Sequence, residues 1–115
     1  MSWQQVCTTA DLEPESALSV EVRAANGAVV PVCIARDCHG TWHAVGDICT
    51  HEDVNLSDGE VFDTTIECPK HGAEFDLCSG RALTLPAVTP VPVYPLTCDN
   101  DGRVFIDVDT RPEEK

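Results

Sequence analysis

The sequence has few aromatic residues, few basic residues and no long apolar run. Phe, Trp and Tyr account for 5% of its 115 residues, so a hydrophobic core must be built mainly from Val, Ile, Leu and Ala. Charged residues, Pro or Gly interrupt every apolar stretch long before the ~20 residues that span a bilayer. The sequence therefore predicts no transmembrane helix and no membrane partner.

We expect no export signal, because Met1 to Gln5 include neither a basic start nor an apolar segment. We therefore expect a cytoplasmic protein, in which thiols stay reduced. The chain has seven cysteines, and this odd number fits metal ligands and free thiols better than a disulfide framework.

Positive charge is scarce, with 7 Lys and Arg against 20 Asp and Glu, and the formal net charge is −13. Such a charge repels nucleic acid, so we expect no nucleic-acid partner. It favours docking on basic surfaces of partner proteins, with association rates that depend on salt. Solubility alone is the simpler explanation unless other features indicate a partner.

Helical periodicity is nearly absent, and short β-rich runs separated by turn residues predict an all-β fold. Asn26-Gly27 is a strong hairpin signal. Pro31 lies inside an apolar run and predicts an edge strand or a bulge there. The expected strands of the scaffold are 3–7, 17–24, 28–35, 41–45, 91–97 and 103–108.

From Gly46 the sequence becomes loop-rich, and only residues 61–62, 65–67 and 74–75 resemble strands. We predict one domain over residues 1–115 with a small inserted subdomain at about 46–88. The scaffold would then comprise residues 1–45 and 89–108, followed by a polar tail at 109–115.

Two short clusters in the inserted segment carry a thiol and an imidazole each. They are Cys49-Thr50-His51 and Cys68-Pro69-Lys70-His71-Gly72. Two Cys and two His can bind structural zinc, or a 2Fe–2S cluster in which the Cys bind one iron and the His the other. The usual zinc finger places both Cys before both His, whereas here they alternate on two loops. The order favours the iron–sulfur cluster, with zinc as the alternative.

This pattern resembles the fingerprint of the Rieske family, Cys-x-His followed by Cys-Pro-x-His-Gly. The similarity continues through Glu74-Phe75-Asp76, Gly80 and Leu85-Pro86-Ala87. It implies an antiparallel β-sandwich or barrel-like scaffold with an inserted cluster-binding subdomain and one 2Fe–2S cluster. The resemblance assigns Cys49 and Cys68 to the inner iron, and His51 and His71 to the outer one.

Departures from the family's high-potential members indicate the subtype. Those members pair an extra Cys in each loop as a disulfide, and Val54 and Lys70 occupy the matching positions here. They also carry Ser and Tyr hydroxyls near the cluster, where this chain has Ala73 and Phe75. Because the lost donors would favour the reduced form, we predict a potential of roughly −150 mV, at the low end of the Rieske range.

A small low-potential Rieske protein resembles the ferredoxin component of bacterial aromatic-ring dioxygenase systems. That resemblance implies a non-catalytic monomer that carries single electrons from a flavoprotein ferredoxin reductase to a terminal oxygenase with its own Rieske centre. Two alternatives remain, a similar ferredoxin associated with iron–sulfur cluster assembly and, less favoured, a small subunit of a nitrite-reductase-like complex.

The other five cysteines are not assigned to the cluster. Cys7, Cys33 and Cys98 lie in apolar strands and are expected in the core. Cys78 lies in a tight turn and is expected to take no part. Cys38 shares a hairpin with His39 and His43; a second metal site is possible there, but a polar turn leading into a strand is favoured.

Overall fold

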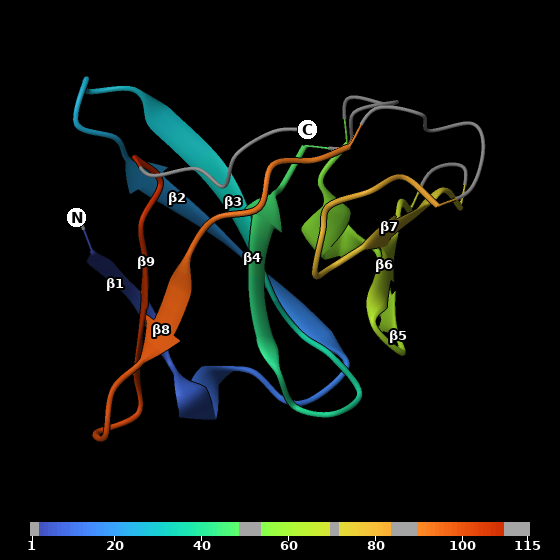
Figure 1. Ribbon diagram of the computed structural model, residues 1–115, viewed down its shortest axis with the longest axis horizontal. Helices are drawn as coiled ribbons and strands as arrows, with labels where there is room; N and C mark the ends of the chain where they lie inside the picture. The colour runs from blue at the N-terminus through green and yellow to red at the C-terminus, as the bar shows by residue number, and fades with distance from the viewer. Residues whose placement is uncertain (1–2, 49–53, 70–71, 84–89, 110–115) are drawn as a thin grey trace.

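The computed structural model describes residues 3–48, 54–69, 72–83 and 90–109 (Figure 1). These residues form nine strands and two single-turn 3-10 helices, so the predicted all-β fold is confirmed. Among them no helix has the length and hydrophobicity needed to span a bilayer.

The strands make three antiparallel sheets of three strands each. One sheet has the order β1-β9-β8, formed by Gln4–Thr8, Arg103–Ile106 and Leu96–Cys98. The second has the order β2-β3-β4, formed by Ser16–Arg23, Val29–Arg36 and Trp42–Gly46. The third, smaller sheet is β5-β6-β7, formed by Glu60–Phe62, Thr65–Glu67 and Glu74–Asp76. The 3-10 helices are η1, Thr9–Asp11, and η2, Leu56–Asp58.

The first two sheets are joined into a barrel-like scaffold by the segment that precedes β8. Val93 forms a bridge with Val45, and the Tyr94 N–H donates to the Ala44 carbonyl at 2.8 Å. At the other side β1 contacts β2. In Figure 1 the small β5-β6-β7 sheet lies on the far side of β4 from β1, β8 and β9.

Strand β3 lies between two hydrophobic cores and contributes residues to both. Val32 and Ile34 point into the basal core, whereas Cys33 and Ala35 point the other way into the loop core, as the alternation of a strand requires. The buried basal core is Cys7, Leu12, Val22, Val32, Ile34, Ala44, Tyr94, Val104, Ile106 and Val108. The buried loop core is Cys33, Ala35, Val45, Leu56, Val61, Ile66, Cys68, Ala73, Phe75, Leu77 and Val91.

The central position of β3 in its sheet corrects the prediction that Pro31 marks an edge strand or a bulge. β3 is the central strand of its sheet, and Pro31 pairs with Glu21 of β2. On its other side, the β3–β4 ladder ends one residue later at the Val32–Gly46 pair. The missing N–H of Pro31 therefore falls where the ladder has already ended, and it costs no sheet hydrogen bond.

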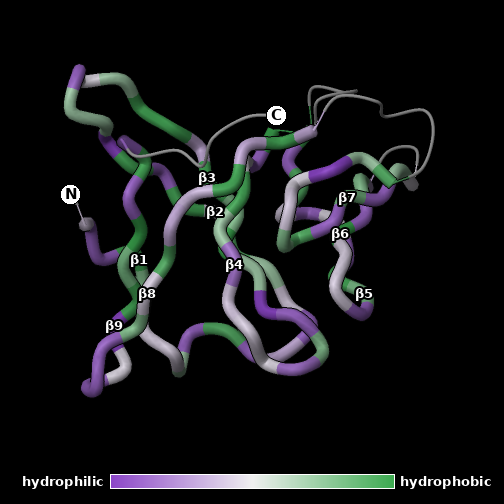
Figure 2. Tube along the Cα trace, in the orientation of Figure 1, coloured by the Kyte–Doolittle hydropathy of each residue, from purple (hydrophilic) through white to green (hydrophobic). Residues whose placement is uncertain are grey.

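Most other predicted strands are confirmed within one or two residues. The exception is 91–97, where only Leu96–Cys98 is a strand and Val93 makes an isolated bridge. Pro92 and Pro95 have no N–H, so a continuous ladder cannot form there. Figure 2 shows a hydrophobic run along β3 and hydrophilic residues at hairpin turns.

Candidate metal centre

The first predicted ligand loop is closed at its base by the chain on either side of it. Ile48 and Asn55 form an antiparallel bridge, and the Leu56 N–H donates to the Asp47 carbonyl at 2.6 Å. Asp47 follows directly after β4, so the scaffold sheet fixes where this loop begins. The segment then continues into η2, whose Leu56 is fully buried in the loop core.

The buried carboxylate of Asp47 holds this base together. Its Oδ1 accepts from the Ser57 N–H at 2.8 Å, and its Oδ2 accepts from the Ser57 hydroxyl at 3.1 Å. The Ser19 hydroxyl of β2 donates to the same Oδ2 at 2.8 Å. Asp47 is 0% exposed, so these hydrogen bonds replace the ones that water would make to an exposed carboxylate. Sequence analysis missed this role; the one signal was an Asp between a buried strand and the first ligand cluster.

The second predicted ligand loop begins at Cys68 and is also closed at its base. The Cys68 N–H donates to the Ala73 carbonyl at 2.7 Å, and the Gly72 N–H donates to the Cys68 carbonyl at 3.0 Å. Gly72 has a φ of +75°, a conformation that a residue with a Cβ adopts at a cost. Strands β6 and β7 flank this loop and set its position.

The bases of both loops meet in the loop core. Leu56 follows the first loop, Cys68 and Ala73 enclose the second, and all three are fully buried there, with Val54 packed against them. Gly59 makes the approach possible, because a Cβ at this position would lie 1.8 Å from the Glu67 carbonyl oxygen. The structure therefore brings together two chain segments that are separate in the sequence.

Of the four predicted ligands, the structure describes only Cys68, a free thiol that is 0% exposed. Cys49, His51 and His71 lie outside the described residues, as do Lys70 and the 85–87 segment. The donor chemistry fits an iron–sulfur cluster, because Cys68 is an unpaired thiol at the junction of the two loops and the sequence supplies three further donors.

The residues predicted to lower the potential lie beside Cys68. Ala73 and Phe75 are both fully buried in the loop core with it, and neither offers a hydroxyl. Val54 packs against the same core as an aliphatic residue, which leaves no thiol for a disulfide at that position.

Comparison with known proteins now decides the family. The model of the Rieske [2Fe-2S] domain matches residues 2–95. This chain belongs to the Rieske family. The cofactor of this family is a 2Fe–2S cluster of the Rieske type, so the predicted fold and cofactor are both confirmed.

Several Rieske relatives of similar size are ferredoxins. The chain is 35% identical over 103 residues to the 3-phenylpropionate/cinnamic acid dioxygenase ferredoxin subunit of Escherichia coli (strain K12), covering 89% of this chain and 90% of the relative. It superposes on a chain in the complex of reduced oxygenase and oxidized ferredoxin in carbazole 1,9a-dioxygenase with a TM-score of 0.82 and 29% identity, covering 96% of this chain and 97% of that one. The carbazole 1,9a-dioxygenase ferredoxin of Nocardioides aromaticivorans IC177 gives a TM-score of 0.78 at 27% identity, covering 93% and 98%.

Outside the ligand loops of this Rieske domain, the remaining cysteines differ from one another. Cys7 and Cys33 are buried as predicted, and burial raises the pKa of both thiols, to about 11 for Cys7. Cys78 is exposed in a turn, also as expected. The prediction for Cys98 is wrong: it is exposed at the last position of β8, directly before the turn in which the Gly102 N–H donates to the Asp99 carbonyl.

His43 is engaged by a neighbouring carboxylate. Its Nε2 lies 2.8 Å from Asp37 Oδ2, and both side chains are nearly buried. Burial alone would raise the pKa of the Asp37 carboxyl, but hydrogen bonds from His43, Thr41 and His39 outweigh it and lower that pKa. The alternation of the strand sends Trp42 to the other face, where the Arg36 guanidinium stacks 5.2 Å from its ring centroid.

Proposed function

We propose that this Rieske protein is the ferredoxin component of a multicomponent ring-hydroxylating dioxygenase system. It carries single electrons from a flavoprotein reductase to a terminal oxygenase that has its own Rieske centre. The observation that carries the proposal is the reciprocal coverage with a dioxygenase ferredoxin subunit, 89% of this chain and 90% of the relative. The carbazole dioxygenase complex supports an oxygenase as the acceptor, since a chain of that complex shares this fold.

In this proposal Cys49 and Cys68 hold the inner iron, and His51 and His71 the outer one. When bound, such a cluster takes up and releases one electron at a time. The surrounding residues of the chain position the two loops through Asp47 and the loop core, and exclude water from the Cys68 side. We place the cluster-binding subdomain at about residues 46–88 and the polar tail at 109–115.

The protein would have no catalytic site of its own, and it would act as a cytoplasmic monomer without a nucleic-acid partner. Its net charge of −13 favours encounter with basic surfaces on the reductase and the oxygenase. The electron-transfer rate is therefore expected to fall as salt is added.

The test is reconstitution with purified components. The protein should be reduced by a flavoprotein reductase with NADH and should then pass electrons to the oxygenase, with oxygenated product as the readout. Cys68→Ser should lose iron, sulfide and transfer together, whereas Cys78→Ser, which changes an exposed turn thiol, should retain all three. A protein with an intact cluster that reduces no dioxygenase oxygenase would contradict this function and favour another acceptor.

A further inference from the structure

Three side chains outside the Rieske site gather at the junction of two turns. Cys38 and His39 lie in the turn between β3 and β4, and Asp63 lies in the turn between β5 and β6. One ligand atom from each lies within 4.8 Å of the other two, and all three residues are exposed. The Cys38 thiol donates to Asp63 Oδ1 at 3.0 Å.

The backbone holds the two turns in this arrangement. The Cys38 N–H donates to the Asp63 carbonyl at 3.0 Å, and the Asp63 N–H donates to Glu15 Oε2 at 3.3 Å. Asp63 has a φ of +58°, in the left-handed region that tight turns use. The Asp37 carboxylate accepts from the N–H groups of His39 and Thr41, at 2.9 and 3.0 Å, and so fixes the backbone that carries the imidazole.

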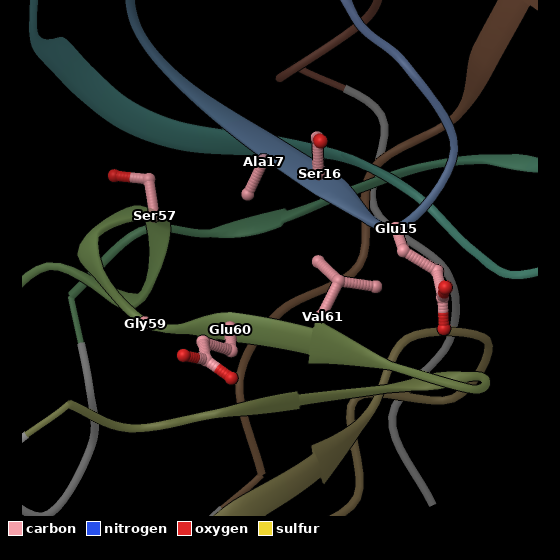
Figure 3. Close-up of a pocket in the computed structure, with 7 residues that line it drawn as sticks. All are labelled: Glu15, Ser16, Ala17, Ser57, Gly59, Glu60 and Val61. Carbon is pink, nitrogen blue, oxygen red and sulfur yellow. The ribbon is translucent and has the colours of Figure 1, made fainter.

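A pocket of about 320 Å³ lies between β2 and the η2–β5 segment. Glu15, which accepts from the Asp63 N–H, is one of the residues that line it. Figure 3 shows that Glu15 extends from the start of β2 towards the tip of the β5–β6 hairpin. The carboxylate of Glu15 is therefore beside the three-residue group and adds negative charge to it. This charge favours a bound cation over a bound anion.

We propose that Cys38, His39 and Asp63 form a second metal site in this protein, which binds one Zn²⁺. A thiolate, an imidazole and a carboxylate are the three kinds of ligand that zinc takes in proteins, with water completing the tetrahedron. Bonds of the usual length set the ligand atoms of such a tetrahedron about 3.5 Å apart. The observed separations need only side-chain rotation to reach this spacing, and the exposed positions allow it.

Binding requires Cys38 to lose its proton. The hydrogen bond to Asp63, with lesser contributions from desolvation and from nearby carboxylates, raises the pKa of this thiol to about 11. Zinc replaces that proton: the S–H bond breaks, an S–Zn bond forms, and H⁺ passes to solvent without any change in oxidation state. The double charge of the ion then balances the thiolate and the Asp63 carboxylate.

A zinc ion bound here would link the β2-β3-β4 sheet to the small β5-β6-β7 sheet. The ligands come from the β3–β4 turn on one side and from the β5–β6 turn on the other. None of them is among the four predicted cluster ligands, so the zinc site and the Rieske site would be filled independently.

The experiment uses the purified protein with its iron–sulfur cluster intact, stripped of loose metal and titrated with Zn²⁺ against a chromogenic chelator. We expect one Zn²⁺ per chain, with the visible absorption of the cluster unchanged. Cys38→Ser and Asp63→Asn should each weaken binding by at least about tenfold, as loss of a metal-site partner does. Cys78→Ser, another exposed turn thiol, should bind zinc like the unaltered protein.

A weakly buffered titration at pH 8 gives a second readout, and about one proton should be released per zinc bound. Several results would overturn the proposal. These are no zinc binding, equal weakening by Cys38→Ser and Cys78→Ser, or zinc uptake that bleaches the cluster absorption, which would place the ion at the cluster ligands.

Discussion

The N–H of Asp47 donates to the carbonyl of Pro31 at 3.2 Å, and the bond is not returned, because proline has no N–H. The carbonyl of Asp47 accepts instead from the Leu56 N–H at 2.6 Å. The chain leaves the β3–β4 ladder at this point and enters the first ligand loop. A residue that would weaken a sheet elsewhere thus lies at the end of the β3–β4 ladder.

Replacing Asp47 should destabilise the base of the first loop. Asp47→Ala leaves the Ser57 N–H and the hydroxyls of Ser19 and Ser57 without their buried acceptor, at a cost of roughly 3 kcal/mol in the free energy of unfolding. Faster loss of the visible absorption on warming should accompany it. Asp58→Ala, an exposed carboxylate one residue from Ser57, is the matched control and should behave like the unaltered protein. Equal stability of both variants would contradict the role of Asp47.

The close approach at Gly59 should not tolerate a side chain. A Cβ there would lie 1.8 Å from the Glu67 carbonyl oxygen, so Gly59→Ala must push the loop bases apart and should cost about 2 kcal/mol or more. Thermal unfolding and cluster content measure the effect. For comparison, Gly27→Ala meets no atom within 4 Å and should cost only about 1 kcal/mol, from its φ of +88°. A larger loss at Gly27 than at Gly59 would refute this ranking.

Restoring hydroxyls beside Cys68 should raise the midpoint potential. Ala73→Ser combined with Phe75→Tyr adds two donors to a buried region that becomes more negative on reduction, and we expect a rise on the order of tens of millivolts. Redox titration followed by visible absorption measures it. Phe105→Tyr adds the same hydroxyl to β9, far from the loop core, and should leave the midpoint unchanged. A double variant with an unshifted midpoint would show that another factor sets the potential.

The Asp37–His43 pair should make the stability of the fold depend on pH in the acid range. The folded-state pKa of Asp37 lies below its ordinary value of 3.8, so the ionised carboxylate stabilises the fold above that pH. This contribution disappears as the pH falls through the lower, folded-state pKa. The difference in melting temperature between the unaltered protein and Asp37→Asn should therefore shrink as the pH falls below about 4. Asp101→Asn, an exposed carboxylate, should show no such convergence.

Several features could be predicted from local sequence because they depend on neighbouring residues. Asn26-Gly27 forms its hairpin, with the Gly27 N–H bonded to the Ala24 carbonyl at 2.9 Å. The short strands of the small sheet also occur where the alternation of apolar residues indicates them. The Cys-x-His and Cys-Pro-x-His-Gly clusters indicate the cofactor for the same reason, since a metal site requires particular donor atoms.

Other features depended on contacts between distant segments. Cys98 and Cys33 both lie in apolar sequence, yet only Cys33 is covered, because the loop core packs on its face of β3. Pro31 could not be placed without knowing where β4 ends. Asp63 joins Cys38 and His39 only because two turns 25 residues apart are hydrogen-bonded to each other.

The sequence by itself determined the all-β character of this protein, its donor atoms and its missing hydroxyls, because each is a property of residue type and short-range spacing. The tertiary structure alone decided which face of β3 belongs to which core and how Asp47 fixes the base of the first loop. It also decided which side chains of the β3–β4 and β5–β6 turns meet. Those outcomes follow from burial, which depends on what the rest of the chain packs against each residue.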